Sequence, residues 1–152
     1  MSAWRTFDRL TWPDRRLLAE AVFCLAAARV LMVSMPFRRL SRRIGDRGRE
    51  SSAAAHPEAA SRTLRRVSWA LGATARRLPW RCACLEQGIA GKMMLRRRGL
   101  PSTLYLGVAR DGEAGSGARA HAWLRSGHSV VTGAAGRERF TVVATFADGD
   151  HA

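Results

Sequence analysis

The chain has 152 residues, of which 26 are Lys or Arg and 12 are Asp or Glu, so its formal net charge is +14. The length suits a single domain with one ordinary core, and the 47% hydrophobic content argues against wholesale disorder. The excess charge lies in residues 1–100, with 21 basic against 7 acidic residues, because residues 101–152 hold 5 of each. The basic part leaves open an anionic partner: nucleic acid, a membrane surface or an acidic peptide.

Residues 13–35 are predicted to form the first helix. Pro13 and Asp14 suit its first turn, and the rest is mostly apolar except for Glu20 and Arg29, which lie on opposite faces. A charge on each face argues against a transmembrane span. We expect a helix largely buried in protein, and we keep contact with a membrane through residues 14–35 as the alternative.

Three further segments continue the helical part. The stretch FRRLSRRIGDRGR after Pro36 is a short basic amphipathic segment that breaks at Gly45 and Gly48. A second helical pattern begins at Pro57, runs to about Arg77 and ends before Pro79, since proline disfavours helix in the residue before it. Residues 82–98 form a third helix, which Gly99 ends.

The pattern then changes to strands. Residues 102–110, 119–125, 128–132 and 139–146 read as strands separated by turns, with a turn or hairpin loop at 111–118. Short strands with tight turns predict an antiparallel meander. Helices followed by strands indicate an α+β fold. We divide the chain into a helical region 1–77, a core 78–147 and a tail 148–152, which together make one compact domain.

The cysteines are Cys24, Cys82 and Cys84. Their number is odd, and no signal peptide opens the chain, so we expect reduced thiols in a cytoplasmic protein. The sequence has no CxxC pair, which argues against structural zinc. It also has no GxxxxGK[ST] motif, which argues against a nucleotide site. We therefore expect no metal and no cofactor.

Cys84 lies in the first turn of the predicted third helix, where the positive end of the helix dipole stabilises a thiolate. A thiolate nucleophile needs a histidine as its base. His121 sits in the middle of an apolar strand, whereas His56 lies in a loop, His128 opens a short strand and His151 is in the tail. On these features alone a structural role for Cys84 and His121 remains the stronger interpretation.

The order of motifs adds a resemblance. "CLEQGIAGKMMLRRRGLPSTLYLGVAR", then "AHAWL", then "RFTVVATF", resembles the stand-alone B2 proteins of lasso-peptide biosynthesis. These are transglutaminase-like cysteine peptidases that remove the leader from a ribosomal precursor peptide. The resemblance covers about residues 78–147 strongly and residues 10–45 more loosely. It implies a papain/transglutaminase-like arrangement of the α+β fold.

Carried over to this sequence, the resemblance implies Cys84 as nucleophile and His121 as general base. The family's usual acid falls near Val131 to Gly133, where this chain has no carboxylate. Glu138 is the nearest acid with plausible reach, and Asp148 and Asp150 are further away. Two alternatives to Glu138 stay open: a backbone group orients His121, or Cys84 and His121 work as a dyad without a third residue. Cys82 is the weaker alternative for the nucleophile.

The resemblance also implies partners. These are the leader region of a precursor peptide, a separate leader-binding B1 protein (a RiPP recognition element) and a macrolactam synthetase that acts on the released core. Nucleic acid is not expected. Three other hypotheses stay open: a basic nucleic-acid-binding module, a membrane-associated adaptor, and a transglutaminase-like fold that has lost catalysis.

Overall fold

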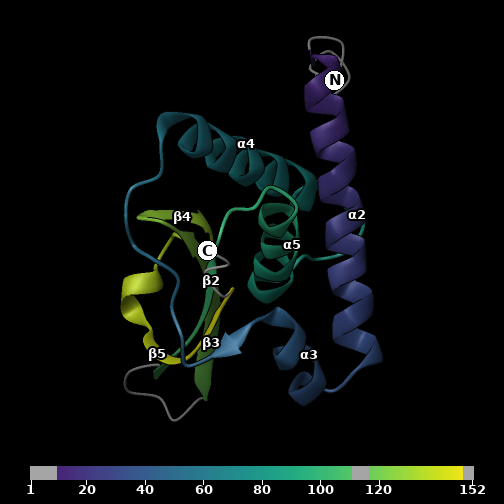
Figure 1. Cartoon of the computed structure of the whole chain (residues 1–152). Coiled ribbons are helices and arrows are strands. Elements are labelled where there is room, and N and C mark those ends of the chain that lie inside the picture. The colour runs from purple at the N-terminus through teal and green to yellow at the C-terminus, as the bar shows by residue number, and fades with distance from the viewer. Residues whose placement is uncertain (1–9, 111–116, 149–152) are drawn as a thin grey trace.

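A computed structural model of the chain describes residues 10–110 and 117–148. The helices are α2 (Trp12–Ser34), α3 (Phe37–Ile44), α4 (Glu58–Ala75) and α5 (Cys84–Arg96), and η1 (Arg137–Arg139) is a short 3-10 helix. The strands are β1 (Asp46–Arg47), β2 (Thr103–Arg110), β3 (Ala118–Ser126), β4 (Ser129–Thr132) and β5 (Thr141–Ala147). The strands form one antiparallel sheet in the order β1-β5-β2-β3-β4 (Figure 1). The expected α+β fold is confirmed.

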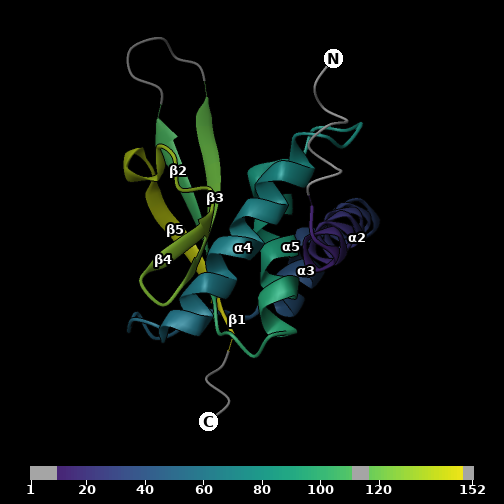
Figure 2. The same cartoon turned by 90° about the horizontal axis from the view of Figure 1, so that it is seen from above.

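The molecule is layered from the sheet outward to α2. Figure 2 shows the sheet on one side, α4 and α5 beside it, and α2 on the side of α5 away from the sheet. One hydrophobic cluster joins these layers and includes Leu25 of α2, Leu71 of α4, Met94 of α5 and Leu124 of β3. The core is therefore continuous across the boundary expected at residue 78.

Helix α2 starts with a capping box. Thr11 is the N-cap, and its side chain accepts a hydrogen bond from the Asp14 backbone N–H while the Asp14 carboxylate accepts one from the Thr11 N–H. One face of the helix is buried in the core, with Leu17, Ala21, Cys24, Leu25 and Ala28. The opposite face is exposed. The expectation of a largely buried helix is thus right for one face and wrong for the other.

Helix α5 approaches the sheet closely because two of its residues lack side chains. A Cβ atom at Gly88 would come within 2.5 Å of Leu104 Cδ1 on β2, and one at Gly91 within 2.8 Å of Leu124 Cδ2 on β3. Both distances are shorter than real Cβ contacts, so a side chain at either position would have to displace the leucine it meets or push the helix away from the sheet. The close packing fixes where the first residue of α5 stands relative to the strands.

The elements predicted from the sequence do not include β1 and η1. The basic segment after Pro36 breaks at Gly45 as predicted, but the chain then pairs with the last strand, Asp46 opposite Ala147. Gly45 has φ +150°, and a side chain there would overlap the Ala147 carbonyl. The predicted turn at 111–118 lies mostly outside the described residues, and β2 and β3 pair antiparallel on either side of it.

Candidate functional site

Cys84 is the first residue of α5. The N-cap is Ala83, in an extended conformation with φ −68° and ψ 159°, and it has no polar side chain to cap the first backbone N–H groups. The thiol is half-buried and packs against the hydrophobic core. A thiol at this position faces the positive end of the helix dipole. The predicted position of Cys84 at a helix start is confirmed.

Two side chains of α5 hold the segment that leads to Cys84. Glu86 is fully buried, and its Oε1 accepts a hydrogen bond from Trp80 Nε1 at 2.7 Å. Gln87 Nε2 donates to the Cys82 carbonyl at 3.1 Å. Arg29 of α2 lies 3.5 Å from the other Glu86 oxygen. The helix start is therefore tied both to the preceding loop and to α2.

The second cysteine of the pair is unsuited to act as a nucleophile. Burial, together with the neighbouring Glu86 carboxylate, raises the pKa of the Cys82 thiol to about 11. A thiol with this pKa is almost entirely protonated near neutral pH, and the protonated form is a poor nucleophile. This favours Cys84 over Cys82.

His121 stands on β3 opposite Gly107 of β2. Its Nε2 lies 2.8 Å from the Gly133 carbonyl oxygen. A carbonyl can only accept a hydrogen bond, so Nε2 carries the proton and, in the neutral ring, Nδ1 is the free base. Gly133 has φ +71°, and a side chain there would overlap the Ala122 carbonyl, so this close approach needs glycine.

Aromatic rings surround the imidazole. The His121 ring centroid lies 5.9 Å from that of Trp123 and 5.0 Å from that of Phe140. A Cβ atom at Gly107 would come within 2.8 Å of Phe140 Cβ, so the glycine leaves the space that these rings occupy. Trp123 in turn stacks on Tyr105 at 5.4 Å. The imidazole is thus held on several sides.

The structure places Cys84 and His121 toward opposite faces of the sheet. Side chains alternate along a strand: Ala122 and Leu124 belong to the core shared with the helices, and His121 shares the opposite face with Trp123. Among the described residues, the hydrogen-bond partner of the imidazole is the Gly133 carbonyl, and no hydrogen bond joins it to the Cys84 thiol. The expected pairing of thiol and imidazole is not formed in this conformation.

The candidate acids lie elsewhere. Glu138 is exposed in η1, and the position that an orienting acid would take on His121 is held by the Gly133 carbonyl. A backbone acceptor, one of the alternatives from the sequence, is therefore the arrangement that the structure contains, and a role for Glu138 stays a prediction. Asp148 instead binds Lys92 Nζ at 2.9 Å and Arg96 Nε at 2.6 Å. Asp150 lies outside the described residues.

Sequence reasoning missed the residues that hold the site rather than react. The Gly133 carbonyl carries no side-chain signal, although a glycine directly after a strand is a hint of a special backbone conformation. Glu86 belongs to the Cys-Leu-Glu stretch, but nothing in the sequence predicts that its side chain is buried. Within residues 10–110 and 117–148, no group of three or more His, Cys, Asp and Glu side chains is placed to hold a metal ion.

Comparison with known proteins places this chain in a family. The sequence profile of the transglutaminase-like superfamily matches residues 18–145, which include Cys84, His121 and Glu138. Among curated proteins and among solved structures, none matches the chain significantly. The match spans most of the chain and both of its layers, the helices and the sheet, and an α+β fold of the papain-like kind fits it. The chain therefore belongs to the transglutaminase-like superfamily.

Proposed function

We propose that the chain is a cysteine peptidase that removes the leader from a lasso-peptide precursor, with Cys84 as the nucleophile. The observation that carries the proposal is the position of Cys84, the first residue of α5, within the matched superfamily region. The Cys-Leu-Glu and Ala-His-Ala-Trp blocks support the narrower assignment. The free thiols of Cys24, Cys82 and Cys84 agree with action in the cytoplasm.

The proposed reaction is acyl transfer to water. The Cys84 thiolate attacks the scissile carbonyl carbon, the C–N bond breaks, and the departing amine of the core peptide takes a proton. Water then hydrolyses the thioester, which releases the leader as a carboxylate and restores the thiol. The backbone N–H of Cys84 stabilises the oxyanion, because the N–H groups in the first turn of a helix have no partner within the helix.

For His121 to take part, the end of β3 has to turn toward α5. On one side β4 pairs with β3 only at Leu124–Ser126, but on the other side β2 pairs with the part that carries His121, so the movement has to break the pairing of His121 with Gly107. The bond from Nε2 to the Gly133 carbonyl would have to move with the ring or break. We propose that binding of the precursor together with its B1 protein supplies this change.

The partners follow from the same proposal. A separate B1 protein binds the leader and delivers it, and the released core passes to an ATP-dependent macrolactam synthetase. The arginines of α4 offer a surface for the acidic groups of such partners.

The test is cleavage of the cognate precursor, followed by mass spectrometry, with and without the B1 protein. Wild-type chain should cleave slowly alone and at least about tenfold faster with the B1 protein. Cys84→Ala should abolish cleavage, and Cys82→Ala should retain most of it. His121→Ala should lower the rate by about 100-fold or more, and His128→Ala, an exposed histidine on the next turn, is the matched control. Cleavage by Cys84→Ala at the wild-type rate would refute Cys84 as the nucleophile. Equal cleavage rates with and without the B1 protein would refute the proposed partner.

One observation favours a second candidate function. The separation of Cys84 from His121 and the missing acid would suit a transglutaminase-like protein that has lost catalysis and only assembles with its partners. In that case no variant would change the fate of the precursor, and the wild-type chain would not cleave it even with the B1 protein. The same assay therefore separates the two candidates.

A further inference from the structure

The outer face of α2 is apolar and uncovered among the described residues. Trp12, Phe23 and Val33 are 71%, 64% and 72% exposed, and Val22 and Val30 are exposed beside them. Their spacing places them on one side of the helix, opposite the face that enters the core. Figure 2 shows that α2 is the layer farthest from the sheet. A contiguous apolar face of this kind usually marks a contact surface.

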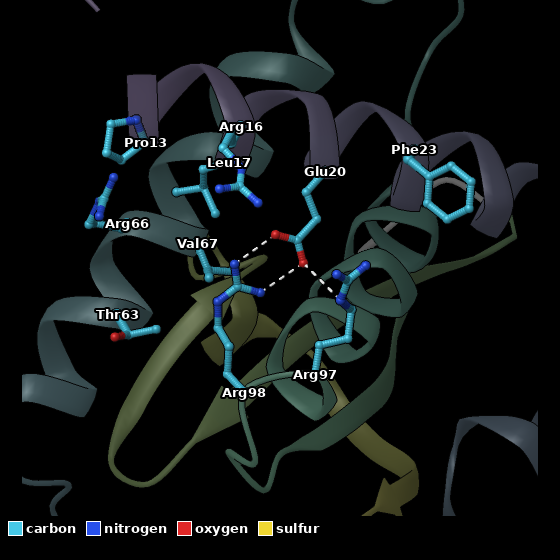
Figure 3. A pocket seen from close by; sticks show the side chains of 10 residues that line it. All are labelled: Pro13, Arg16, Leu17, Glu20, Phe23, Thr63, Arg66, Val67, Arg97 and Arg98. Carbon is cyan, nitrogen blue, oxygen red and sulfur yellow. Dashed lines mark hydrogen bonds and ion pairs between the residues drawn. The ribbon is translucent and has the colours of Figure 1, made fainter. Parts of the chain in front are cut away.

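Arginines line both long sides of this face. On one side is a cleft of about 550 Å³ with Arg16, Arg66, Arg97 and Arg98 at its wall. Its acid, Glu20, is already bound by Arg98 at 2.7 Å and Arg97 at 3.5 Å (Figure 3). On the other side is a hollow of about 680 Å³, mainly apolar, with Arg15, Arg76 and Arg77 and no acid. Both flanks are therefore positive.

Helix α3 continues the positive charge beyond the end of α2. It follows directly after Pro36, buries Leu40 and Ile44, and exposes the four arginines Arg38, Arg39, Arg42 and Arg43. Its segment contains no acid. The apolar face of α2 is thus bordered by cations along both sides and at its C-terminal end.

The pattern selects one occupant. A second copy of the chain would set arginine rows against arginine rows, which is unfavourable. Spanning a bilayer is also unfavourable. Helix α2 is long and apolar enough to cross one, but its inner face is packed into the core, and Arg29 pairs with the buried Glu86. An apolar strip bordered by arginines matches the boundary between the acyl chains and the phosphates of an anionic bilayer.

We propose that α2 and α3 dock the protein on the surface of an anionic lipid bilayer. The side chains of the outer face, above all Trp12, Phe23 and Val33, enter the region between headgroups and acyl chains, and the flanking arginines bind lipid phosphates. The inference goes beyond the proposed peptidase activity and does not depend on it. Docking through α2 and α3 would hold the protein at the membrane surface, with the sheet facing away from the lipid.

The experiment is co-sedimentation of the full chain with vesicles of phosphatidylcholine alone or mixed with phosphatidylglycerol. We expect at least about tenfold stronger partitioning to the anionic vesicles, and loss of this preference in high salt. Val30→Asp with Val33→Asp should weaken partitioning by at least about tenfold. The matched control, Val142→Asp with Val143→Asp, changes the net charge equally at exposed valines of β5 and should leave most of the binding.

A second pair tests the arginines. Arg38→Gln with Arg42→Gln should weaken binding to anionic vesicles by about tenfold, whereas Arg137→Gln with Arg139→Gln, the same loss of charge in η1, should have a small effect. Equal effects of the two aspartate pairs or of the two glutamine pairs would overturn the proposal, because binding would then report net charge alone. A dimer in analytical ultracentrifugation that the α2 aspartates dissociate, without vesicle binding by the wild type, would assign the face to a second copy. Failure here leaves the precursor-cleavage test unaffected.

Discussion

At the scale of single residues, two cysteines two positions apart occupy different environments. Cys84 is at the helix terminus and half-buried, whereas the pKa of Cys82 is raised to about 11 by burial and by Glu86. The difference comes from the register of the helix start: Glu86 is one turn beyond Cys82 and reaches back to the loop, where it also holds Trp80.

This difference predicts selective alkylation. At pH 8 a thiol with a pKa of about 11 has roughly 100-fold less thiolate than an ordinary cysteine, so iodoacetamide should label Cys84 well before Cys82. Peptide mass spectrometry over a time course measures both rates. Glu86→Gln removes the carboxylate and should speed labelling of Cys82. Equal labelling of the two thiols in the folded wild type would contradict the assigned environments.

The carbonyl of Gly133 predicts the tautomer of His121. The neutral ring should carry its proton on Nε2, which nitrogen-detected NMR reads directly. Gly133→Ala places a side chain at φ +71° and against the Ala122 carbonyl, so it should cost about 1–3 kcal/mol of unfolding free energy and mix the tautomers of His121. A proton found on Nδ1 in the wild type would show that the bond to Gly133 is not made in solution.

At the scale of elements, α5 and the strands beneath it set the positions of the site. Gly88 and Gly91 let the helix lie close to Leu104 and Leu124. The spacing also explains the division of faces on β3, because the small Ala122 and the larger Leu124 fill the space under the helix. His121 and Trp123 are left for the other face.

The close packing predicts an asymmetry between two helical glycines. Gly91→Leu forces a large side chain against Leu124 and Leu71, whereas at Gly72 of α4 a Cβ would meet only the end of the Arg76 side chain. Denaturant unfolding should therefore find Gly91→Leu less stable than Gly72→Leu by more than about 2 kcal/mol. Equal unfolding midpoints for the two variants would show that α5 does not lie this close to the sheet.

Most of the elements could be predicted from the sequence, because their signals are local. Pro79, Gly99 and Pro101 predict where helices end, and alternating apolar residues predict the strands. Two-residue β1 has no such signal, since only its pairing with the last strand makes it a strand. The face on which His121 lies is likewise set by the register of β3 against α5, and a shift of one residue would reverse it.

At the scale of the whole molecule, a buried lysine ties the layers together. Lys92 is almost fully buried and donates to the Ser102 carbonyl at 2.8 Å and to Asp148. Arg96 binds the other oxygen of Asp148 and the Ile44 carbonyl. This network joins α3, α5, the start of β2 and the end of β5. Burial lowers the pKa of Lys92 to about 8, and Asp148 opposes that change only in part.

The lowered pKa predicts how stability depends on pH. The folded state holds the lysine proton more weakly than the unfolded state, so this group stabilises the fold increasingly as pH rises from about 8 toward 10.5. Relative to Lys92→Met, the wild type should gain roughly 1 kcal/mol of unfolding free energy between pH 8 and 9. Taking the difference removes the opposite contribution of Cys24 and Cys82, whose raised pKa values lower stability as pH rises through 9. Parallel profiles for the two proteins would contradict a buried, weakly basic Lys92.

The central claim is that this transglutaminase-like chain performs covalent chemistry at Cys84. The most direct measurement is mass spectrometry of the chain after rapid quenching with its precursor and B1 protein. The claim predicts a thioester of the leader on the peptide that contains Cys84, its mass that of the leader less one water. The adduct should vanish in Cys84→Ala and persist in Cys82→Ala. Release of the leader by Cys84→Ala at the wild-type rate, or a leader adduct on Cys82, would contradict the account.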